Sequence, residues 1–301
     1  MWSSMLTNHW LVILPLMIGC DGNREPAPPP SQSSSPVTEP VPVAETTPAE
    51  SGPPTEESAD FCGKKWPLAT TDLDCYDKAV SDLAPLAKLS GLQTLDLSGT
   101  SVTDLGPLAG LTNLHNLQLR NTQVTDLAPL ANLTNLKYLN VFGAHVDDLA
   151  PLASLTMLES LGLGKTEVID LTPLANLTNL SELILADTKV YDLDPLVKLA
   201  KLSRLHIGGT EVGDLRPLAK LTQLQTLHLD HNKRIDDLQV LAKLTKLKWL
   251  GIRFTKVTNL DPLFKLEKLE HLYILGMITT IPEPQRKKLQ TAIPRLEIHL
   301  W

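Results

Sequence analysis

The sequence has few cysteines, few aromatic side chains and no apolar run long enough to span a bilayer. Its 301 residues include 3 Cys, and aromatic residues make up 4%. The N-terminal apolar run, Trp10–Gly19, covers about ten residues, whereas a membrane-spanning helix needs about 20. Cys-x-x-Cys and His-x-x-x-His spacings are missing, and no nucleophile stands beside a candidate base. We therefore predict no catalytic residue, no metal ligand and no cofactor.

The net acidic charge of the chain is carried by one N-terminal segment. Residues 21–60 hold eight acidic side chains against Arg24, which sums to −7. The whole chain also has a formal net charge of −7, so residues 61–301 are formally neutral. A protein that binds nucleic acid usually presents a basic face to the phosphates. The charge therefore predicts that nucleic acid is not a partner.

The first 60 residues have the composition of an exported and tethered protein. Residues 1–19 contain the apolar run of a signal peptide. The following sequence, Met17-Ile18-Gly19-Cys20, resembles a bacterial lipoprotein cleavage site, which implies a lipid on Cys20; an ordinary secretion signal or a weak anchor is the alternative. Residues 20–60, dominated by Pro, Ser, Thr and Glu, are predicted to form a disordered tether that reaches at most about 100 Å. The predicted location is extracytoplasmic and membrane-anchored, in the periplasm or at the cell surface.

The two remaining cysteines agree with that location. Cys62 and Cys75 form an even pair once Cys20 is assigned to the lipid. Disulfides persist outside the cytosol, so we predict a disulfide between Cys62 and Cys75 that holds the N-terminal end together. Two reduced and buried thiols are the alternative.

A 22-residue unit repeats from about residue 70 to residue 270. Each typical unit contains an Asp-Leu pair and a Pro two residues after the leucine, as in Asp104-Leu105-Gly106-Pro107. A fixed period in this range indicates a solenoid, in which each unit buries its apolar face on its neighbours. The end units must shield the stack from water, so both ends are expected to be atypical.

One unit, residues 92–113, predicts the local structure. The alternation in Leu95-Asp96-Leu97 indicates a short, half-buried strand. Asp104 suits the cap of a helical turn, and the few residues left favour a 3₁₀ turn over a full α-helix. The predicted fold class is therefore an α/β solenoid with parallel β-strands on one side and 3₁₀ turns on the other. One unit has 23 residues, and its extra residue, within Asp230–Arg234, predicts a local bulge.

The consensus LxxLxLxxTxVxDLxPLAxLTxL resembles the leucine-rich repeat family, in its 22-residue, internalin-like class. The resemblance implies a curved, right-handed horseshoe whose concave face carries the strands and binds the ligand. The family often has Asn where this chain has Thr, as at Thr100, so different hydrogen bonds are expected along that turn.

The ends of the repeat array set the predicted domain boundaries. We predict an N-terminal cap with a degenerate first repeat at 61–91, leucine-rich repeats at 92–268, and a last repeat with a C-terminal cap at 269–301. In the last segment, Pro282–Ala292 predicts a short helix. Ile293, Leu296 and Ile298 then repeat the spacing of the earlier leucines, which predicts one final strand.

Side chains that flank the buried leucines, such as Thr94, Asp96 and Ser98, point to the concave face, because neighbours along a strand alternate. Their repeats in successive units form three concave columns. Large aromatic, His and Arg side chains gather there, mainly toward the C-terminal half, and such residues dominate binding interfaces. Small residues between the groups, such as Gly162 and Gly164, predict a shallow trough. Ordinary solvated side chains on an arbitrary surface are the alternative. The predicted protein-binding residues are Arg120, Tyr138, Phe142, Arg204, His206, His228, Asp230, Trp249, Arg253, His271 and Tyr273.

These features predict a non-catalytic binding protein, tethered to a membrane, that recognises another protein through its concave face. A structural or adhesion protein that binds cell-envelope polymers is the alternative. A metal-dependent enzyme is the least favoured reading. It rests on His206, His228 and Asp230, which fall on neighbouring strands about 4.8 Å apart and could ligate zinc.

Overall fold

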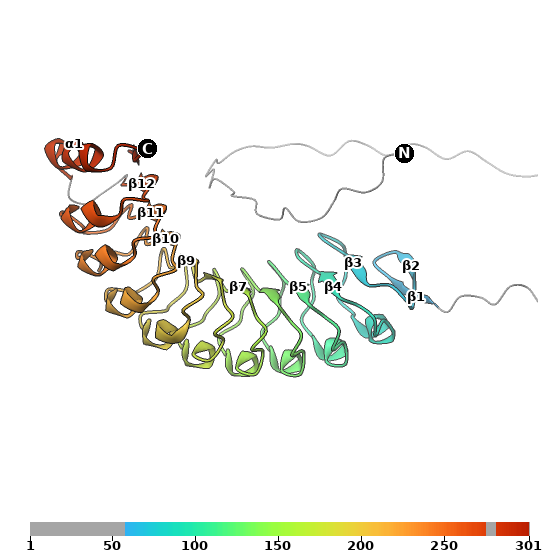
Figure 1. Cartoon of the computed structure of the whole chain (residues 1–301). Helices are drawn as coiled ribbons and strands as arrows, with labels where there is room; N and C mark the ends of the chain where they lie inside the picture. Colours follow the sequence, from blue (N-terminus) through green and yellow to red (C-terminus); the bar gives the residue numbers. More distant parts are fainter. Residues whose placement is uncertain (1–57, 275–280, 301) are drawn as a thin grey trace, which may run out of the picture. The chain divides into compact units, whose positions relative to one another are not determined.

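The computed structural model describes residues 58–274 and 281–300. These residues stack into a curved solenoid, with strands along its inner side and helical turns along its outer side (Figure 1). The predicted signal peptide and the predicted lipid site at Cys20 lie outside the described residues, as does most of the predicted tether. Within residues 58–274 and 281–300, no helix is both long and apolar enough to cross a membrane.

In the described part of the chain, eleven parallel strands form one sheet in which each strand pairs with the next along the sequence. From β3 to β10 the register repeats every 22 residues, as in Leu95 opposite Leu117, so equivalent side chains lie side by side. This confirms the predicted solenoid. The strands are β3 Asp72–Asp74, β4 Thr94–Asp96, β5 Asn116–Gln118, β6 Tyr138–Asn140, β7 Ser160–Gly162, β8 Glu182–Ile184, β9 Arg204–His206, β10 Thr226–His228, β11 Trp249–Gly251, β12 His271–Tyr273 and β13 Glu297–His299.

A 3₁₀ turn follows each strand from β3 to β11 on the outer side, as the sequence predicts. The predicted Asp residues lie one position before the cap residue of each turn, which is a leucine such as Leu105, and they bind the start of the turn from there. The carboxylate of Asp104, for example, accepts a hydrogen bond of 2.7 Å from the backbone N–H of Gly106, the first residue of its turn. Equivalent bonds recur in the other units, and Asn259 takes this role for Asp261. The turns are η1 Ala84–Lys88, η2 Gly106–Leu108, η3 Ala128–Leu130, η4 Ala150–Leu152, η5 Thr172–Leu174, η6 Asp194–Lys198, η7 Arg216–Lys220, η8 Gln239–Lys243 and η9 Asp261–Lys265.

The core is a continuous stack of leucines between the sheet and the 3₁₀ turns. In β8, Leu183 is 0% exposed, and its partners in the ladder, Leu161 and Leu205, are equally buried. The flanking Glu182 and Ile184 are partly exposed. The predicted alternation between core and concave face is therefore confirmed.

The turn after a strand is held by side-chain hydrogen bonds of two kinds. The hydroxyl of Thr100 donates to the carbonyl of Leu97 within its own unit, at 2.6 Å. Asn232 instead joins two units, because its amide donates to Ile207 and Leu229 while its side-chain oxygen accepts from Thr210. The Thr residues thus satisfy a buried group locally, and Asn232 adds a cross-link between neighbouring units.

The 23-residue unit keeps the sheet intact. Val102 comes two residues after Thr100, whereas Ile235 comes three residues after Asn232 and donates its N–H to the carbonyl of Asn232 at 3.2 Å. Strand β10 still pairs in register with β11. The extra residue is therefore absorbed in the turn after Asn232, inside the segment in which the sequence predicts a bulge.

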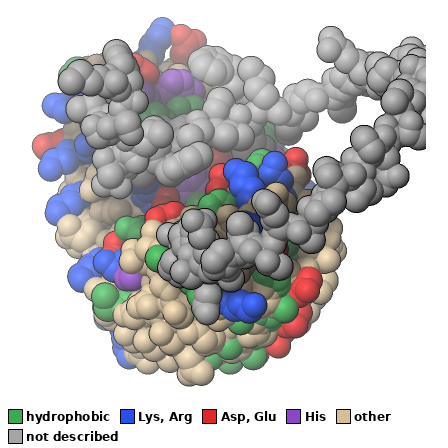
Figure 2. Space-filling model, turned by 90° about the vertical axis from the view of Figure 1, so that its right-hand side faces the viewer, with side chains coloured by type: hydrophobic (Ala, Val, Ile, Leu, Met, Phe, Trp, Pro, Cys, Tyr) green, Lys and Arg blue, Asp and Glu red, His purple; other side chains and the backbone are tan. Residues whose placement is uncertain are grey.

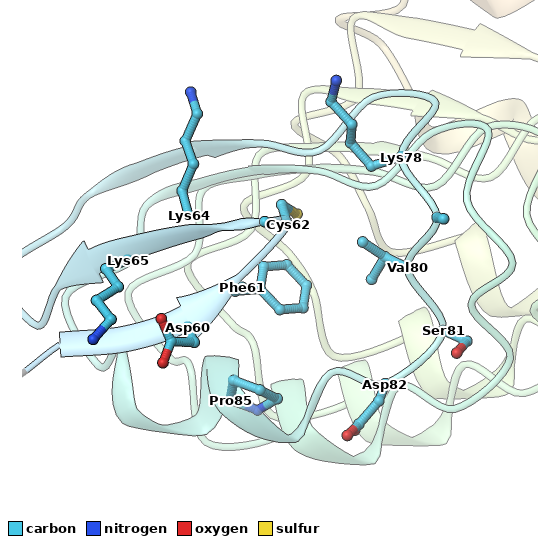
Figure 3. Close-up of a pocket in the computed structure, with 12 residues that line it drawn as sticks. Asp60, Phe61, Cys62, Lys64, Lys65, Lys78, Val80, Ser81, Asp82 and Pro85 are labelled. Carbon is cyan, nitrogen blue, oxygen red and sulfur yellow. The ribbon is translucent and has the colours of Figure 1, made fainter. Parts of the chain in front are cut away.

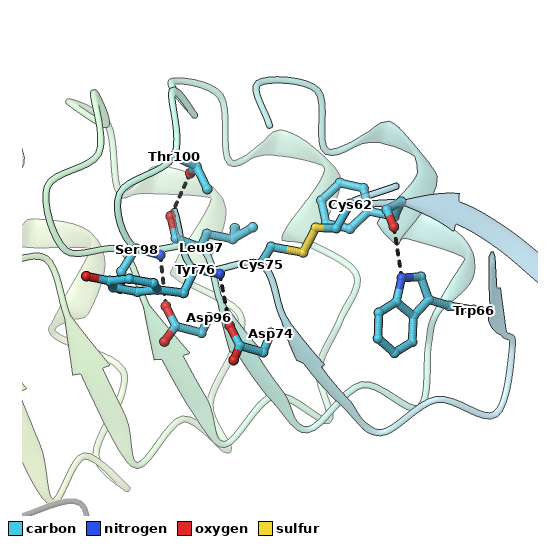
Figure 4. Close-up of a disulfide and its surroundings, with 10 residues drawn as sticks. Cys62, Trp66, Asp74, Cys75, Tyr76, Asp96, Leu97, Ser98 and Thr100 are labelled. Atoms are coloured by element: carbon cyan, nitrogen blue, oxygen red, sulfur yellow. Dashed lines mark hydrogen bonds between the residues drawn. A yellow bond between two sulfur atoms is a disulfide. The ribbon is translucent and has the colours of Figure 1, made fainter. Parts of the chain in front are cut away.

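The N-terminal end is closed by a hairpin and a disulfide. Strands β1, Ser58–Phe61, and β2, Lys64–Pro67, pair antiparallel, so the last residues assigned to the tether, 58–60, belong to the cap. The predicted disulfide joins Cys62 to Cys75 next to the first repeat (Figure 4). The indole N–H of Trp66 donates to the carbonyl of Phe61 at 2.9 Å and tightens the hairpin.

The C-terminal end has a different cap. Helix α1, Glu283–Ala292, lies within the segment for which the sequence predicts a helix. It leads into β13, which extends the sheet by pairing with β12. The concave face therefore continues for one strand beyond the last regular repeat.

Candidate functional site

Aromatic rings cluster on the concave face at its C-terminal end. The Trp249 ring lies 3.9 Å from the His271 ring, measured between centroids, and 6.1 Å from the Tyr273 ring. Tyr273 in turn stacks on His299 at 4.3 Å. The guanidinium of Arg253 lies 5.7 Å from the Tyr273 ring centroid, in a cation–π contact. We call Trp249, Arg253, His271, Tyr273 and His299 the aromatic cluster; four of these five residues are predicted binding residues.

Polar side chains from β9, from β10 and from the residues just after β10 adjoin the aromatic cluster. We call Arg204, His206, His228 and Asp230 the polar group. The rings of His206 and His228 are 4.0 Å apart, and His228 Nδ1 lies 3.8 Å from Asp230 Oδ2. Asp230 is nearly buried and accepts hydrogen bonds from the backbone N–H and the guanidinium of Arg253, at 2.7 and 3.2 Å. Arg204 lies 3.6 Å from Glu182. Asp230 thus links the polar group to the aromatic cluster through Arg253.

Burial and neighbouring charges shift the pKa values of this polar group. The pKa of His206 is lowered from 6.5 to about 3, chiefly by burial and also by the nearby His228 and Arg204, while Asp230 opposes the shift. Burial alone raises the pKa of Asp230, but its contacts with His228 and Arg253 outweigh burial and hold the pKa below 3.8. At neutral pH the face therefore presents a neutral His206 beside an ionised Asp230.

The shifted pKa of His206 predicts a dependence of stability on pH. Between pH 6.5 and 3 the unfolded chain binds a proton at residue 206 that the folded chain does not, so stability falls as the pH falls. From pH 7 to pH 5 this costs about 2 kcal/mol, a loss that His206→Gln removes. Urea unfolding of both proteins at the two pH values measures the difference. Equal losses in both proteins would show that His206 is not the group responsible.

A second group of predicted residues lies earlier on the same face. The Phe142 ring is contacted by Arg120 and by Lys165, each 5.6 Å from its centroid. The hydroxyl of Tyr138 donates to Glu159 at 3.2 Å. Burial and Glu159 together raise the pKa of Tyr138. The predicted binding residues therefore form two separate groups.

The predicted trough between the two groups is partly wrong. Gly162 and Gly164 are buried, because side chains of the preceding unit cover them. A Cβ on Gly164 would come within 2.8 Å of the Phe142 ring, and a Cβ on Gly162 within 2.6 Å of the Asn140 side chain. The glycines therefore make room for neighbouring side chains and leave no open hollow at these two positions.

Two residues of this end of the face, Glu297 and His299, are absent from the predicted set. They stand opposite His271 and Tyr273 in the register of β12 with β13. The sequence does carry a signal for them. The spacing of Ile293, Leu296 and Ile298 predicts the final strand, and the residues that flank Ile298 extend two of the concave columns.

A hollow among the described residues lies elsewhere, beside the N-terminal cap. It measures about 870 Å³ and includes Phe61, Val80 and Pro85 in its lining (Figure 3). The side chains of Lys64 and Lys78 point away from it. Asp60, Ser81 and Asp82 also line the hollow, but none of the predicted binding residues does.

Charge does not single out a binding surface on the face shown in Figure 2. On the face shown in Figure 2, Lys and Arg side chains lie among Asp and Glu side chains, and neither sign occupies the face alone. This mixture agrees with the formal neutrality of residues 61–301. We therefore take the aromatic cluster, with its adjoining polar group, as the candidate functional site.

Fold and surface together define a leucine-rich solenoid with side chains of the binding type on its concave face. A family model described as "Leucine Rich repeats (2 copies)" matches residues 112–154 and 200–243. The chain belongs to the leucine-rich repeat family and has an internalin-like fold. No curated protein sequence matches it.

Solved structures give the same assignment. Internalin C2 of Listeria monocytogenes is 37% identical, with a TM-score of 0.60, and the match covers 62% of this chain and 82% of that chain. An internalin from the same species, inlF, is 26% identical over 79% of this chain and 85% of that chain, with a TM-score of 0.53. The plant peptide hormone receptor RGFR1, solved in complex with RGF2, is 15% identical over 74% of this chain and 42% of that chain, with a TM-score of 0.59. The last likeness shows the fold alone.

Proposed function

We propose that this protein is a non-catalytic binding protein that recognises another protein through its concave face, outside the cytoplasm and on a membrane tether. The observation that carries the proposal is the aromatic cluster. Trp, Tyr and Arg are the residues that most often dominate binding energy at protein interfaces. Here Trp249 and Tyr273 stand on adjacent strands of one sheet, and Arg253 lies in the turn directly after β11.

The cluster is also suited to binding because its side chains are already ordered. Trp249 packs on His271, and Tyr273 packs between His299 and Arg253. A side chain that is held in place before binding loses little conformational entropy when a partner arrives. The sheet that carries these residues is fixed by the leucine stack beneath it.

The relatives support a binding role without naming the partner. Leucine-rich repeat proteins of the internalin-like class are typically non-catalytic. The plant receptor of the same fold is solved with RGF2 bound, which shows that this fold can serve recognition. Both the internalin likeness and the disulfide between Cys62 and Cys75 favour an extracytoplasmic location.

Loss of the Trp249 and Tyr273 rings is expected to weaken specific binding strongly. We expect immobilised full-length protein to retain a specific partner from an envelope extract, and the double variant Trp249→Ala with Tyr273→Ala to bind that purified partner about tenfold to 100-fold more weakly. Mass spectrometry identifies the partner, and biolayer interferometry gives the Kd.

The matched control is Tyr191→Ala, which removes an aromatic side chain that is 61% exposed and lies outside the three concave columns. It should leave the Kd unchanged. Weak retention of wall polymer that is equal in all three proteins would instead favour an adhesion protein and refute recognition by the aromatic cluster.

Membrane tethering is a separate part of the proposal and has its own test. The segment before Cys20 supports it, because an apolar run ends in a small residue followed by the cysteine. We expect Cys20→Ser to move the protein from the membrane fraction to the soluble fraction, while Cys62→Ser leaves its distribution unchanged. Immunoblots of fractionated cells measure this. A Cys20→Ser variant that stays with the membrane would contradict lipidation.

A further inference from the structure

Three side chains with metal-binding atoms converge at the C-terminal end of the sheet. His271 on β12 and His299 on β13 direct ring nitrogens toward each other, with 3.2 Å between Nδ1 of His271 and Nε2 of His299. Oε2 of Glu297 lies 3.3 Å from the first nitrogen and 3.7 Å from the second. Among residues 58–274 and 281–300, this is the one group of three or more His, Cys, Asp or Glu side chains that could hold a metal ion.

These distances match one face of a tetrahedral zinc site. Zinc binds His nitrogen at about 2.0–2.1 Å and carboxylate oxygen at about 2.0–2.2 Å, so neighbouring ligand atoms in a tetrahedron lie about 3.3–3.5 Å apart. The three atoms are 3.2, 3.3 and 3.7 Å apart, and a point about 2 Å from all of them exists. We propose that His271, Glu297 and His299 bind a divalent transition metal ion, with Zn²⁺ as the best fit.

The surroundings of the three residues favour a preformed site. The His271 ring packs on Trp249 at 3.9 Å, and the His299 ring stacks on Tyr273 at 4.3 Å, with 12° between the ring planes. Both histidine side chains are mostly buried, at 23% and 16% exposed. Packing on two sides fixes the rings, so an incoming ion meets ligands that are already oriented.

The fourth coordination position is open to solvent. Glu297 is on the last strand of the sheet and its side chain is 66% exposed, so the ion is reached from this side. Three protein ligands with a fourth open position can hold a water molecule or a group of a bound partner. The ion also links β12 to β13, and it thereby fastens the last strand of the C-terminal cap to the repeats.

His206, His228 and Asp230, the trio considered from the sequence, do not form such a site. Nδ1 of His228 is 3.8 Å from Asp230, and the carboxylate of Asp230 is already occupied by the guanidinium and backbone N–H of Arg253. This pair of adjacent histidines therefore serves as an internal control for nonspecific binding by neighbouring imidazoles.

Metal titration of the full-length protein tests the proposal. After treatment with a chelator and buffer exchange, we expect one Zn²⁺ to bind per chain by isothermal titration calorimetry. Co²⁺ should give the intense visible absorption of a tetrahedral complex, and Zn²⁺ should raise the melting temperature. Loss of an outer-shell partner typically costs 10–100-fold in metal affinity, so His299→Gln, which removes a ligand, should weaken binding by about 100-fold or more.

Two further variants keep the outcome decisive. Glu297→Gln changes an exposed side chain and retains its shape, so it reports on the site even if His299→Gln fails to fold; it should also weaken binding strongly. His228→Gln should leave the affinity and the Co²⁺ spectrum unchanged. Absence of binding at about 100 µM Zn²⁺, or affinity that Glu297→Gln and His299→Gln leave unchanged, would overturn the proposal.

Discussion

Replacing Leu183 by Asp is expected to unfold the central repeats. Leu183 is 0% exposed in β8, and no cation lies among its ladder partners, Leu161 and Leu205. An ionised carboxylate at this position would be buried without a partner, which costs about 4 kcal/mol or more. Because each unit is stabilised by its neighbours, the loss should spread to the flanking units and not stay in one.

The adjacent residue supplies a matched control. Ile184 follows Leu183 in the same strand, but it lies on the concave face and is partly exposed. Ile184→Asp introduces the same charge one position away and should change the free energy of unfolding by less than about 1 kcal/mol.

Two measurements together check this expectation. Circular-dichroism melts compare the stabilities of the two variants, and hydrogen exchange locates the repeats that open. A Leu183→Asp protein that melts like the wild type, or an Ile184→Asp protein that is equally destabilised, would contradict the assignment of the core and concave faces.

The fold could be predicted in detail because its rules are local and repeat. A leucine at a fixed position in every unit, such as Leu95, must be buried wherever the chain alternates between faces. Asp104 also occupies a fixed position, two residues before Gly106, the first residue of its 3₁₀ turn. Its carboxylate therefore accepts a hydrogen bond from the backbone N–H of Gly106. Because the same sequence pattern recurs in many units, an atypical residue in one unit does not change the predicted fold.

The concave surface could be predicted only as a set of positions. Which residues share a column follows from the period, and the register confirms it. How far a long side chain reaches does not follow from the period. Phe142 covers Gly164 because its ring extends over the next unit, and that contact depends on rotamers. The sequence therefore predicted a hollow where a side chain lies.

The C-terminal site was missed for a related reason. Glu297 and His299 follow an α-helix, so they fall outside the 22-residue period that defines the concave columns. Only the pairing of β13 with β12 brings His299 next to His271. A repeat-based reading loses accuracy at the caps, where the chain has to depart from the repeat to end it.

Loss of the disulfide is expected to open the N-terminal cap. The bond between Cys62 and Cys75 spans 13 residues and ties the β1–β2 hairpin to the first repeat. Closing a loop of about this length stabilises a folded protein by roughly 3 kcal/mol, mainly by restricting the unfolded chain. We therefore expect a variant with Cys62→Ala and Cys75→Ala to lose about 3 kcal/mol of stability in the cap, measured by hydrogen exchange in residues 58–100.

The location of the lost hydrogen-exchange protection shows whether the disulfide stabilises only the N-terminal cap or the whole stack of repeats. Cys75 is 0% exposed and stands where later units have a core leucine, so Ala at this position also leaves a cavity at the end of the stack.

A second variant, Cys62→Ala with Cys75→Leu, separates the contribution of the disulfide from that of core packing, because it fills the core without the covalent link. If the disulfide acts by restricting the chain, this variant stays less protected than the wild type in residues 58–100 while β7 and β8 exchange as before. Full recovery by the Leu variant would assign the stability of the cap to packing, and equal deprotection along the whole stack would show that the repeats cannot hold their fold without the closed N-terminal end.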